Sequence, residues 1–293
     1  RSFLNLDEAY KDTYKQLVLH PVRAMANLYD MYYAVAMNHK LAQEKDAKAN
    51  YWADYADECF ARDAAYTKDY NLNISKGKWN HMMDQTHIGY KSWDEPKEGN
   101  IKPTVYRIAK EEAKTGGYIF EEKNGVVAME AEHFFETKAS AKAKWTVIPD
   151  LGRTLSGIVL MPYNEKTAGS AISYQFNLKN KPSEVKIHFI FDSTLPFKKG
   201  GHSIKAYLDK NNSKIIGLNQ DLTWANNYTK MYPAAAARVV EKVETFVVPA
   251  NQNGNFTLTV EPLDPGIVLH KIIIDNGGYE ETYLKMDESP YKR

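Results

Sequence analysis

The sequence has little cysteine, no excess of charge of one sign and no long hydrophobic run. Its single cysteine, Cys59, excludes an intramolecular disulfide, so cysteine usage does not decide the compartment. The 38 Lys and Arg residues nearly balance the 37 Asp and Glu residues, which gives no electrostatic case for nucleic acid or an anionic membrane as a partner. No apolar run is long enough to cross a bilayer, and we therefore expect no membrane span.

The sequence also lacks an initiator methionine and a visible signal peptide. Because it begins with Arg1, we interpret the chain as a fragment or a processed product of a longer protein. Its 293 residues, 43% hydrophobic and 26% charged, are enough for two ordinary domains with a buried core. Disorder over long stretches is therefore not expected.

The first part of the chain has the residue pattern of helices. A short amphipathic stretch precedes Pro21, which fits the first turn of a second helix. From Val22 to Ala36 apolar residues recur at helical spacing, and Asn38-His39 end or weaken this pattern. A third helix is predicted over 42–66. The apolar sides of these helices cannot all be buried within one small bundle, so we expect them to pack on something outside the chain.

The pattern changes in the middle of the chain. Residues 96–117 contain two prolines, three glycines and several charges, which favours a linker. After it come short segments rich in Val, Ile, Phe and Thr, separated by turns, which predict a β-sandwich. The sequence thus predicts an α+β multidomain fold. An N-terminal antiparallel helical bundle segment covers 1–95, and a jelly-roll-like β-sandwich, similar to a carbohydrate-binding module, covers 118–293.

The first candidate site is the polar and aromatic stretch 79–90. Its two histidines and Asp84 could bind zinc, although their spacing matches no standard zinc motif. An imidazole beside a carboxylate could also act in acid–base chemistry. The alternative is a structural role, with side chains hydrogen-bonded at a seam between domains. The candidates for substrate or interdomain contact are Trp79, Asn80, His81, Gln85, His87 and Tyr90.

The second candidate site is a group of carboxylates. Glu130 and Glu132 are two residues apart on a predicted strand and would therefore point to the same face. Two such carboxylates repel unless a cation or solvent intervenes, and calcium prefers oxygen ligands of this kind. Asp275 could supply a third carboxylate. Solvent-facing charges are the alternative. Carboxylates this close do not suit an inverting glycosidase, so we assign no catalytic residue.

The third candidate site is a set of aromatic residues in the predicted sandwich. Aromatic rings are apolar, and Tyr and Trp also carry a polar group, so they can stack on sugar rings. Trp145, Trp224 and Tyr228 are the candidates for sugar contact, with Tyr232 close by in the sequence. The alternative is that a tryptophan in a sandwich belongs to the core.

Three segments, 77–90, 148–157 and 264–275, resemble the C-terminal part of glycoside hydrolase family 115, the xylan α-1,2-glucuronidases. The helical stretch from Leu19 to Val35 is also similar to this family. The resemblance implies a parent enzyme that removes glucuronic acid or its 4-O-methyl ether from xylan with inversion, in the periplasm or outside the cell. The catalytic groups of the family belong to an upstream barrel, which this chain does not resemble.

The family resemblance therefore implies a chain that is inactive alone. Such a chain would support the catalytic barrel, position the decorated saccharide or form a homodimer. An autonomous binding module for decorated xylan and a purely structural tail are the alternatives. The sandwich also resembles carbohydrate-binding modules of families 6 and 35, in which a Glu-x-Glu pair and an Asp hold calcium. By this likeness Glu130, Glu132 and Asp275 imply a structural calcium, although no cofactor is required.

Overall fold

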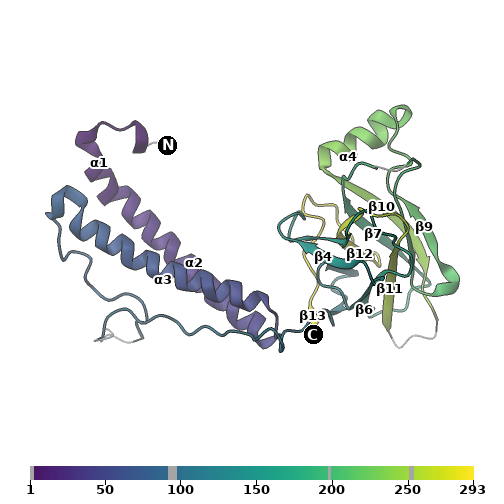
Figure 1. Ribbon diagram of the computed structural model, residues 1–293, viewed down its shortest axis with the longest axis horizontal. Coiled ribbons are helices and arrows are strands. Elements are labelled where there is room, and N and C mark those ends of the chain that lie inside the picture. Colours follow the sequence, from purple (N-terminus) through teal and green to yellow (C-terminus); the bar gives the residue numbers. More distant parts are fainter. Residues whose placement is uncertain (1–2, 92–97, 197–198, 251–253) are drawn as a thin grey trace. The chain divides into compact units, whose positions relative to one another are not determined.

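The computed structural model describes residues 3–91, 98–196, 199–250 and 254–293. The chain divides into two units, Arg1–Thr115 and Gly116–Arg293. The first unit is helical and the second is built from two β-sheets (Figure 1). The predicted domain boundary at residues 95 and 96 lies outside the described residues. The predicted fold class, a helical segment followed by a β-sandwich, is confirmed.

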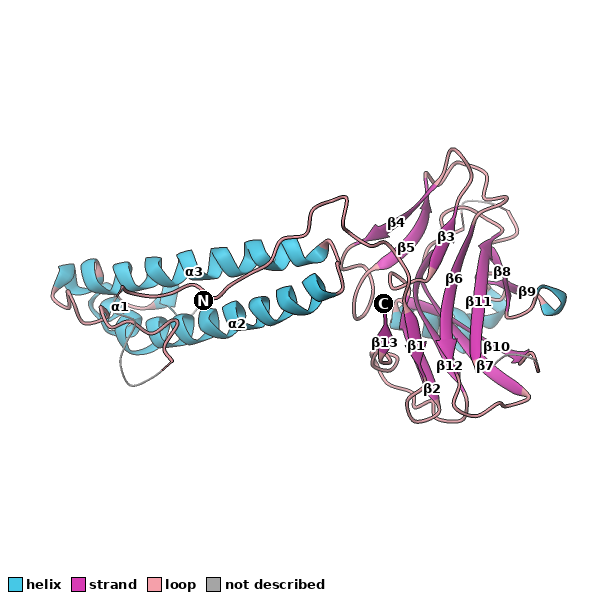
Figure 2. Ribbon diagram, turned by 90° about the horizontal axis from the view of Figure 1, so that it is seen from below, coloured by secondary structure: helices cyan, strands magenta, loops and turns pink. Residues whose placement is uncertain are grey.

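Two long helices form the first unit. α2 (His20–Gln43) and α3 (Lys48–Leu72) lie side by side (Figure 2). α1 (Glu8–Tyr14) and a π-helical turn (Lys15–Leu19) precede α2, and short 3-10 turns cover Phe3–Asn5 and Ile74–Gly77. The buried positions at the seam carry small side chains, which allow the helices to approach closely: Ala34, Ala49, Ala53, Ala56 and Cys59. No helix among the described residues has both the length and the apolar character needed to cross a membrane.

The helices run further than the sequence pattern predicts. Pro21 lies in the first turn of α2, and the π-helical turn before it keeps the chain helical through this position. Asn38 does not end α2, which continues to Gln43. Its side chain is fully buried and donates to the carbonyl oxygens of Ala49 and Tyr106, so the cost of a mid-helix asparagine is offset by tertiary hydrogen bonds.

The second unit is a sandwich of two sheets. The first sheet has the order β13 (Tyr291–Lys292), β1 (Ile119–Glu121), β6 (Ala171–Asn177), β11 (Asn255–Pro262), β8 (Ser203–Tyr207) and β9 (Lys214–Gly217), and β3 (Glu136–Lys138) also pairs with β6. The second has the order β10 (Val239–Val247), β7 (Glu184–Asp192), β12 (Val268–Asp275), β5 (Gly157–Met161) and β4 (Lys144–Ile148), and β2 (Val126–Glu130) also pairs with β12. The strand pairs are antiparallel apart from β1 and β6.

Side chains from the two facing sheets fill one core. β6 alternates between buried and half-buried residues, as expected for a strand with one face turned inward. The largest fully buried side chains are aromatic: Phe120, Tyr174, Phe176, Phe189, Phe191 and Phe246. By contrast, β12 is buried on both faces as far as Ile274. The C-terminal segment covers its outer face, where Ile273 packs with Tyr279 and Met286.

A short helical region projects between β9 and β10. It starts with the turns Trp224–Asn226 and Asn227–Met231 and continues as α4 (Tyr232–Ala237). Ala234 packs against the core of the sandwich. The guanidinium of Arg153 donates to the carbonyl oxygens of Ala237 and Tyr283, which ties the end of α4 to the C-terminal segment.

Candidate functional site

An extended segment, residues 102–108, lies along α2 and α3, and we call it the strap. Two asparagine side chains hold it by imitating a β-ladder. Asn38 donates to the carbonyl oxygen of Tyr106 and accepts from its amide, both at 2.8 Å. Asn50 makes the same pair of bonds with Ile108, at 2.9 and 2.8 Å. The strap thus belongs to the helical unit, although its residues fall within the predicted linker.

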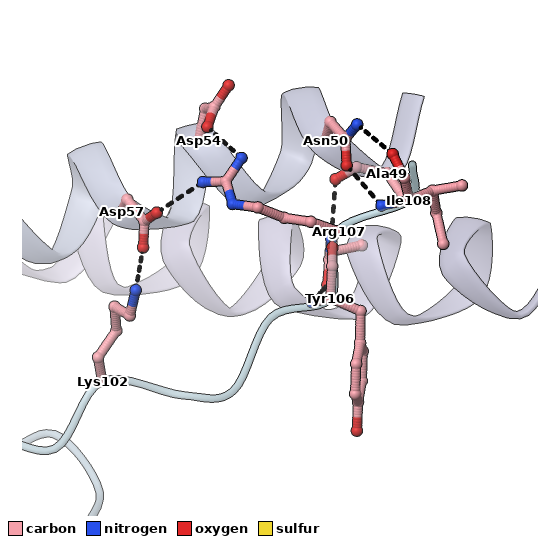
Figure 3. Close-up of polar contacts among 9 residues, drawn as sticks. Ala49, Asn50, Asp54, Asp57, Lys102, Tyr106, Arg107 and Ile108 are labelled. Atoms are coloured by element: carbon pink, nitrogen blue, oxygen red, sulfur yellow. Dashed lines mark hydrogen bonds and ion pairs between the residues drawn. The ribbon is translucent and has the colours of Figure 1, made fainter. Parts of the chain in front are cut away.

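Ion pairs fix the strap to α3 as well (Figure 3). Arg107 contacts Asp54 at 2.7 Å and Asp57 at 3.0 Å, and Lys102 also pairs with Asp57. Hydrogen bonding to Lys102 and Arg107, together with their charge, lowers the pKa of Asp57 against the opposing effect of burial. Because these side chains are partly exposed, their ion pairs contribute less to the stability of the strap than the asparagine contacts do.

The polar stretch 79–90 folds as a series of turns rather than a helix. It brings His81 within 2.6 Å of Asp84, which also accepts from Asn71 of α3 at 2.7 Å. Trp79 lies under the ammonium of Lys78, with its indole nitrogen buried and without an acceptor among the described residues. Asn80, Gln85 and Tyr90 are exposed.

His87 docks this stretch on α3. Its Nε2 lies 2.9–3.0 Å from both oxygens of the buried Asp63, and its Nδ1 lies 3.0 Å from the carbonyl oxygen of Gln85. Both neighbours are acceptors, so the site suits the protonated imidazole, which donates from both ring nitrogens. Burial disfavours that cation, but the Asp63 carboxylate and the Gln85 carbonyl outweigh it and raise the pKa of His87. The arrangement is that of a structural ion pair.

His87→Gln should therefore lower the stability of the helical unit most at mildly acidic pH. The folded state binds the His87 proton more tightly than the unfolded state does, so this stabilisation is complete below about pH 6.5 and disappears as the pH rises through the raised folded pKa. With His87 35% exposed, we expect a deficit of about 1 kcal/mol at pH 6 and almost none at pH 9. Urea unfolding of both proteins across this range measures it, and a deficit that grows with pH would contradict the assignment.

The three carboxylates predicted for calcium are not brought together. In the ladder between β2 and β12, Glu130 lies opposite Lys271, whereas Asp275 lies opposite Val126, four residues and about 13 Å further along. The Oδ1 atom of Asp275 accepts from the amides of residues 277–279. Glu132 is buried beyond the end of β2, with an oxygen 3.8 Å from His133.

The cation beside Glu130 is the ammonium of Lys271, at 2.9 Å, and both side chains are almost fully buried. Lys271 also donates to the carbonyl oxygens of Leu284 and Met286, at 3.2 and 2.8 Å. Burial raises the pKa of Glu130, and Lys271 and the hydroxyl of Thr154 only partly offset this. Among the described residues no group of three or more His, Cys, Asp or Glu side chains could hold a metal ion. These residues do not fit calcium as a set.

The structure separates the three aromatic candidates. Trp145 packs against the core and donates from its indole nitrogen to the carbonyl oxygen of Lys138. Trp224 and Tyr228 project into solvent from the region around α4, with 81% and 85% of their surface exposed. Only the latter two are therefore placed to stack on a ligand from solution.

α2 carries a second apolar row that is exposed within the helical unit, where Tyr33 at its end contacts the ring of Trp52 in α3. Its members are Val18, in the turn before the helix, and Val22, Met25, Tyr29 and Tyr33, all exposed. The buried row of α2, which includes Asn27 and Met31, is displaced by two residues and so lies on the opposite side of the helix. A helix that is apolar on both sides is normally buried within a larger assembly. We call the exposed residues the outer α2 row.

Sequence reasoning missed the contacts that stabilise each unit from within. Asn38 gave one usable signal, since asparagine in mid-helix disfavours the helix unless its amide has other partners. Asn50 lies in the first turn of α3 and gave none. Lys271 gave none, because a lysine in a strand is ordinarily expected to face solvent.

These features define a helical unit with an uncovered face, followed by a β-sandwich without an evident catalytic centre among its described residues. The family model of the glycosyl hydrolase family 115 C-terminal domain matches residues 119–288. The chain belongs to this family, which confirms the resemblance found in the sequence. No curated protein matches the chain.

Three solved structures have regions similar to this chain. One is a family GH115 4-O-methyl-α-glucuronidase, BtGH115A, with specificity for decorated arabinogalactans. It is 19% identical with a TM-score of 0.39, over 96% of this chain and 31% of that one. The C-terminal family 6 carbohydrate-binding module of LamC, a laminarinase from Zobellia galactanivorans, is 15% identical with a TM-score of 0.34, over 51% and 98%. A module from Cellvibrio mixtus lichenase 5A, in complex with cellotriose, is 15% identical with a TM-score of 0.31, over 51% and 95%. The chain thus spans about a third of the first of these structures.

Proposed function

We propose that the chain is the non-catalytic C-terminal portion of a family 115 glycoside hydrolase and that its helical unit packs on the catalytic barrel upstream of it. The parent enzyme would remove glucuronic acid or its 4-O-methyl ether from xylan. It would act in the periplasm or outside the cell, where polysaccharides are met. The observation that carries the proposal is the outer α2 row.

The energetics favour a covered surface over a solvated one. Each large apolar side chain of the row would contribute about 1.5–3 kcal/mol when fully buried. The helical unit by itself buries few large side chains, since its seam is made mainly of alanines.

We expect the double substitution Met25→Lys and Tyr29→Lys to detach the chain from the catalytic barrel. Two charges placed in an apolar interface would weaken association at least about a hundredfold, since each 1.4 kcal/mol corresponds to a factor of ten. The measurement is co-purification of the separately tagged barrel and chain, followed by the thermal stability of the barrel. Leu195→Lys is the matched control, because Leu195 is an exposed residue of the sandwich.

Two further outcomes distinguish the alternatives. Release of glucuronic acid from glucuronoxylan by the chain alone would overturn the non-catalytic role. If light scattering shows a dimer of the chain that the double substitution converts to a monomer, a second copy rather than the barrel covers the outer α2 row. If neither barrel nor dimer depends on the row, the proposal fails.

A further inference from the structure

The segment 148–157, which carries part of the family resemblance, meets β12 around His270. In β12 both Leu269 and Ile272 face the core, so the two residues between them, His270 and Lys271, point away from it. The ladder with β7 shifts its register at this place, which is a β-bulge. The bulge therefore sets an imidazole next to the buried lysine on the outer face of the second sheet.

The His270 side chain is buried without a partner for its ring. It is 4% exposed, and neither ring nitrogen has a hydrogen-bond partner among the described residues. A β-carbon on Gly157 would lie 3.3 Å from Cδ2 of His270, so the glycine makes room for the ring. Burial lowers the pKa of His270, the charge of Asp192 opposes this effect, and the charge of Arg153 adds to it. The site therefore suits the neutral imidazole.

The loop between β4 and β5 lies against His270 and links distant parts of the sandwich. Leu151 of this loop reaches the same space above the glycine as the His270 ring does. Arg153 of the loop donates to the carbonyl oxygens of Ala237, at the end of α4, and of Tyr283, in the C-terminal segment. A shift of the loop would release both of these contacts.

The C-terminal segment, residues 279–289, is docked on the outer face of the second sheet mainly by polar contacts. Its apolar contribution there is small, with Tyr279 and Met286 packed against three buried residues of the sheet. Lys285 and Met286 have φ values of 57° and 65°, a conformation that residues other than glycine rarely adopt. The docked form therefore depends on hydrogen bonds such as those of Arg153.

Two other histidines beside this segment differ from His270, because each has a carboxylate partner. The Nδ1 atom of His133 lies 2.7 Å from Glu288, and that of His188 lies 2.8 Å from Glu241. A proton on either ring would complete an ion pair and favour docking. A proton on His270 would have the opposite effect, since the ring has no acceptor within hydrogen-bond distance among the described residues.

We propose that His270 makes the docking of the C-terminal segment sensitive to acid: when its imidazole takes up a proton from solvent, the loop between β4 and β5 and the C-terminal segment separate from the sheet. The imidazolium would lie near the cation of Arg153, and the neighbouring Glu130 carboxylate is already engaged by Lys271. Asp192, at the end of β7, is the one carboxylate whose charge acts on the ring in the closed form. Movement of the loop admits water to the ring and removes the repulsion by Arg153.

Acid favours the open form in a defined window of pH. The open state has a solvated ring with the ordinary pKa of about 6.5, whereas the closed state binds the proton less tightly. The ratio of open to closed molecules therefore rises by up to about tenfold for each pH unit below 6.5. Glu130 has the opposite effect, since burial raises its pKa, and it is present in every variant compared. Hydrogen bonds lower the pKa values of Glu241, to about 2, and of Glu281 against the effect of burial, so both stay charged above about pH 5.

Hydrogen exchange of the whole chain at pH 7 and pH 5, corrected for the intrinsic pH dependence of exchange, tests this proposal. In the parent protein we expect the amides of residues 279–289 to open at least about fivefold more at pH 5. His270→Met fills the space with an adaptable side chain that takes up no proton, so opening should agree within about twofold at the two pH values. His81→Gln, which removes a histidine with 78% of its side chain exposed, should behave like the parent.

A direct titration accompanies the exchange measurement. The ring proton signal of His270, identified by its absence in His270→Met, should titrate below about pH 6.5. Arg153→Gln removes the link between loop and segment at a half-buried position. The segment of this variant should therefore open already at pH 7, and acid should add less than about twofold.

Four results would overturn the role of His270. They are equal opening of the parent at pH 5 and pH 7, full acid-induced opening in His270→Met, titration of the ring above pH 6.5, and an unchanged acid response in Arg153→Gln. If His270→Met does not fold, the titration of the parent and the Arg153→Gln variant still decide the question. Neither the barrel nor the outer α2 row enters this proposal, so it and the proposed function can fail separately.

Discussion

Lys271→Met is expected to destabilise the sandwich by about 3–5 kcal/mol at neutral pH, because it removes the only partner cation that the structure shows at the buried Glu130 carboxylate. It also releases the carbonyl oxygens of Leu284 and Met286, which hold the C-terminal segment against the sheet. Chemical denaturation measures the loss. Hydrogen exchange should show the amides of residues 279–289 opening before the rest of the sandwich.

Acid should reduce this loss. Burial already raises the pKa of Glu130 in the native protein, and removal of Lys271 raises it further, so Glu130 in the variant takes up a proton more readily as the pH falls. The variant should thus be closest to the parent at about pH 4–5. A loss that is constant from pH 4 to pH 8 would show that lost packing, rather than the unpaired charge, accounts for it.

Two controls isolate the buried pair. Lys205→Met removes a lysine 3.9 Å from Glu261, with both side chains about one-third exposed, and should cost less than about 1 kcal/mol. The double variant Lys271→Met with Glu130→Gln should recover part of the loss, since it no longer buries a charge. If the double variant is as unstable as Lys271→Met, the carboxylate is not the source of the instability.

The sequence was most informative where a hydrophobic period extends over many residues. The alternation in β6 and the buried run in β12 predict the sandwich, because both strands are long enough to show their pattern. β1 and β3 have three residues each, too few to display a period, and were not predicted. The end predicted for α2 at Asn38-His39 was wrong because a tertiary contact outweighed the local propensity.

The partners of the candidate site residues could not be predicted, because they come from segments distant in the sequence. The spacing of Glu130 and Glu132 suggests a shared face, yet β2 ends at Glu130, and Lys271 comes from another strand. The sequence identified His87 as a candidate for substrate or interdomain contact, but it could not identify the partner, because Asp63 lies 24 residues earlier on α3. The exposure of Trp224 and Tyr228 could not be predicted either. An aromatic residue in a short helical turn can be buried or exposed, and only the tertiary packing decides which.

Asn38→Ala should release the strap from the helical unit, with a cost of about 2–4 kcal/mol. The substitution removes three hydrogen bonds of 2.8 Å from a fully buried position, and it leaves the amide of Tyr106 without its acceptor. Arg107 provides a proteolysis assay for the strap, because trypsin cleaves after arginine and the ion pairs of Arg107 with α3 restrict access in the closed form. Lys102 precedes Pro103 and is therefore not a trypsin site. Since cleavage of a briefly opened segment follows the free energy of opening, we expect at least about tenfold faster cutting after Arg107.

Three further variants test whether the hydrogen bonds of Asn38 account for this effect. Asn50→Ala loses two bonds at a less buried position, so its effect should be smaller, and Asn5→Ala at an exposed position should change little. Asn38→Asp keeps the acceptor for the Tyr106 amide but loses the donor to two carbonyl oxygens, so it should fall close to Asn38→Ala. If trypsin cuts the strap of Asn38→Ala no faster than that of the parent protein, the ion pairs of Lys102 and Arg107 hold it. In that case the ion pairs shown in Figure 3, and not the asparagine hydrogen bonds, would be the main contacts that keep the strap closed.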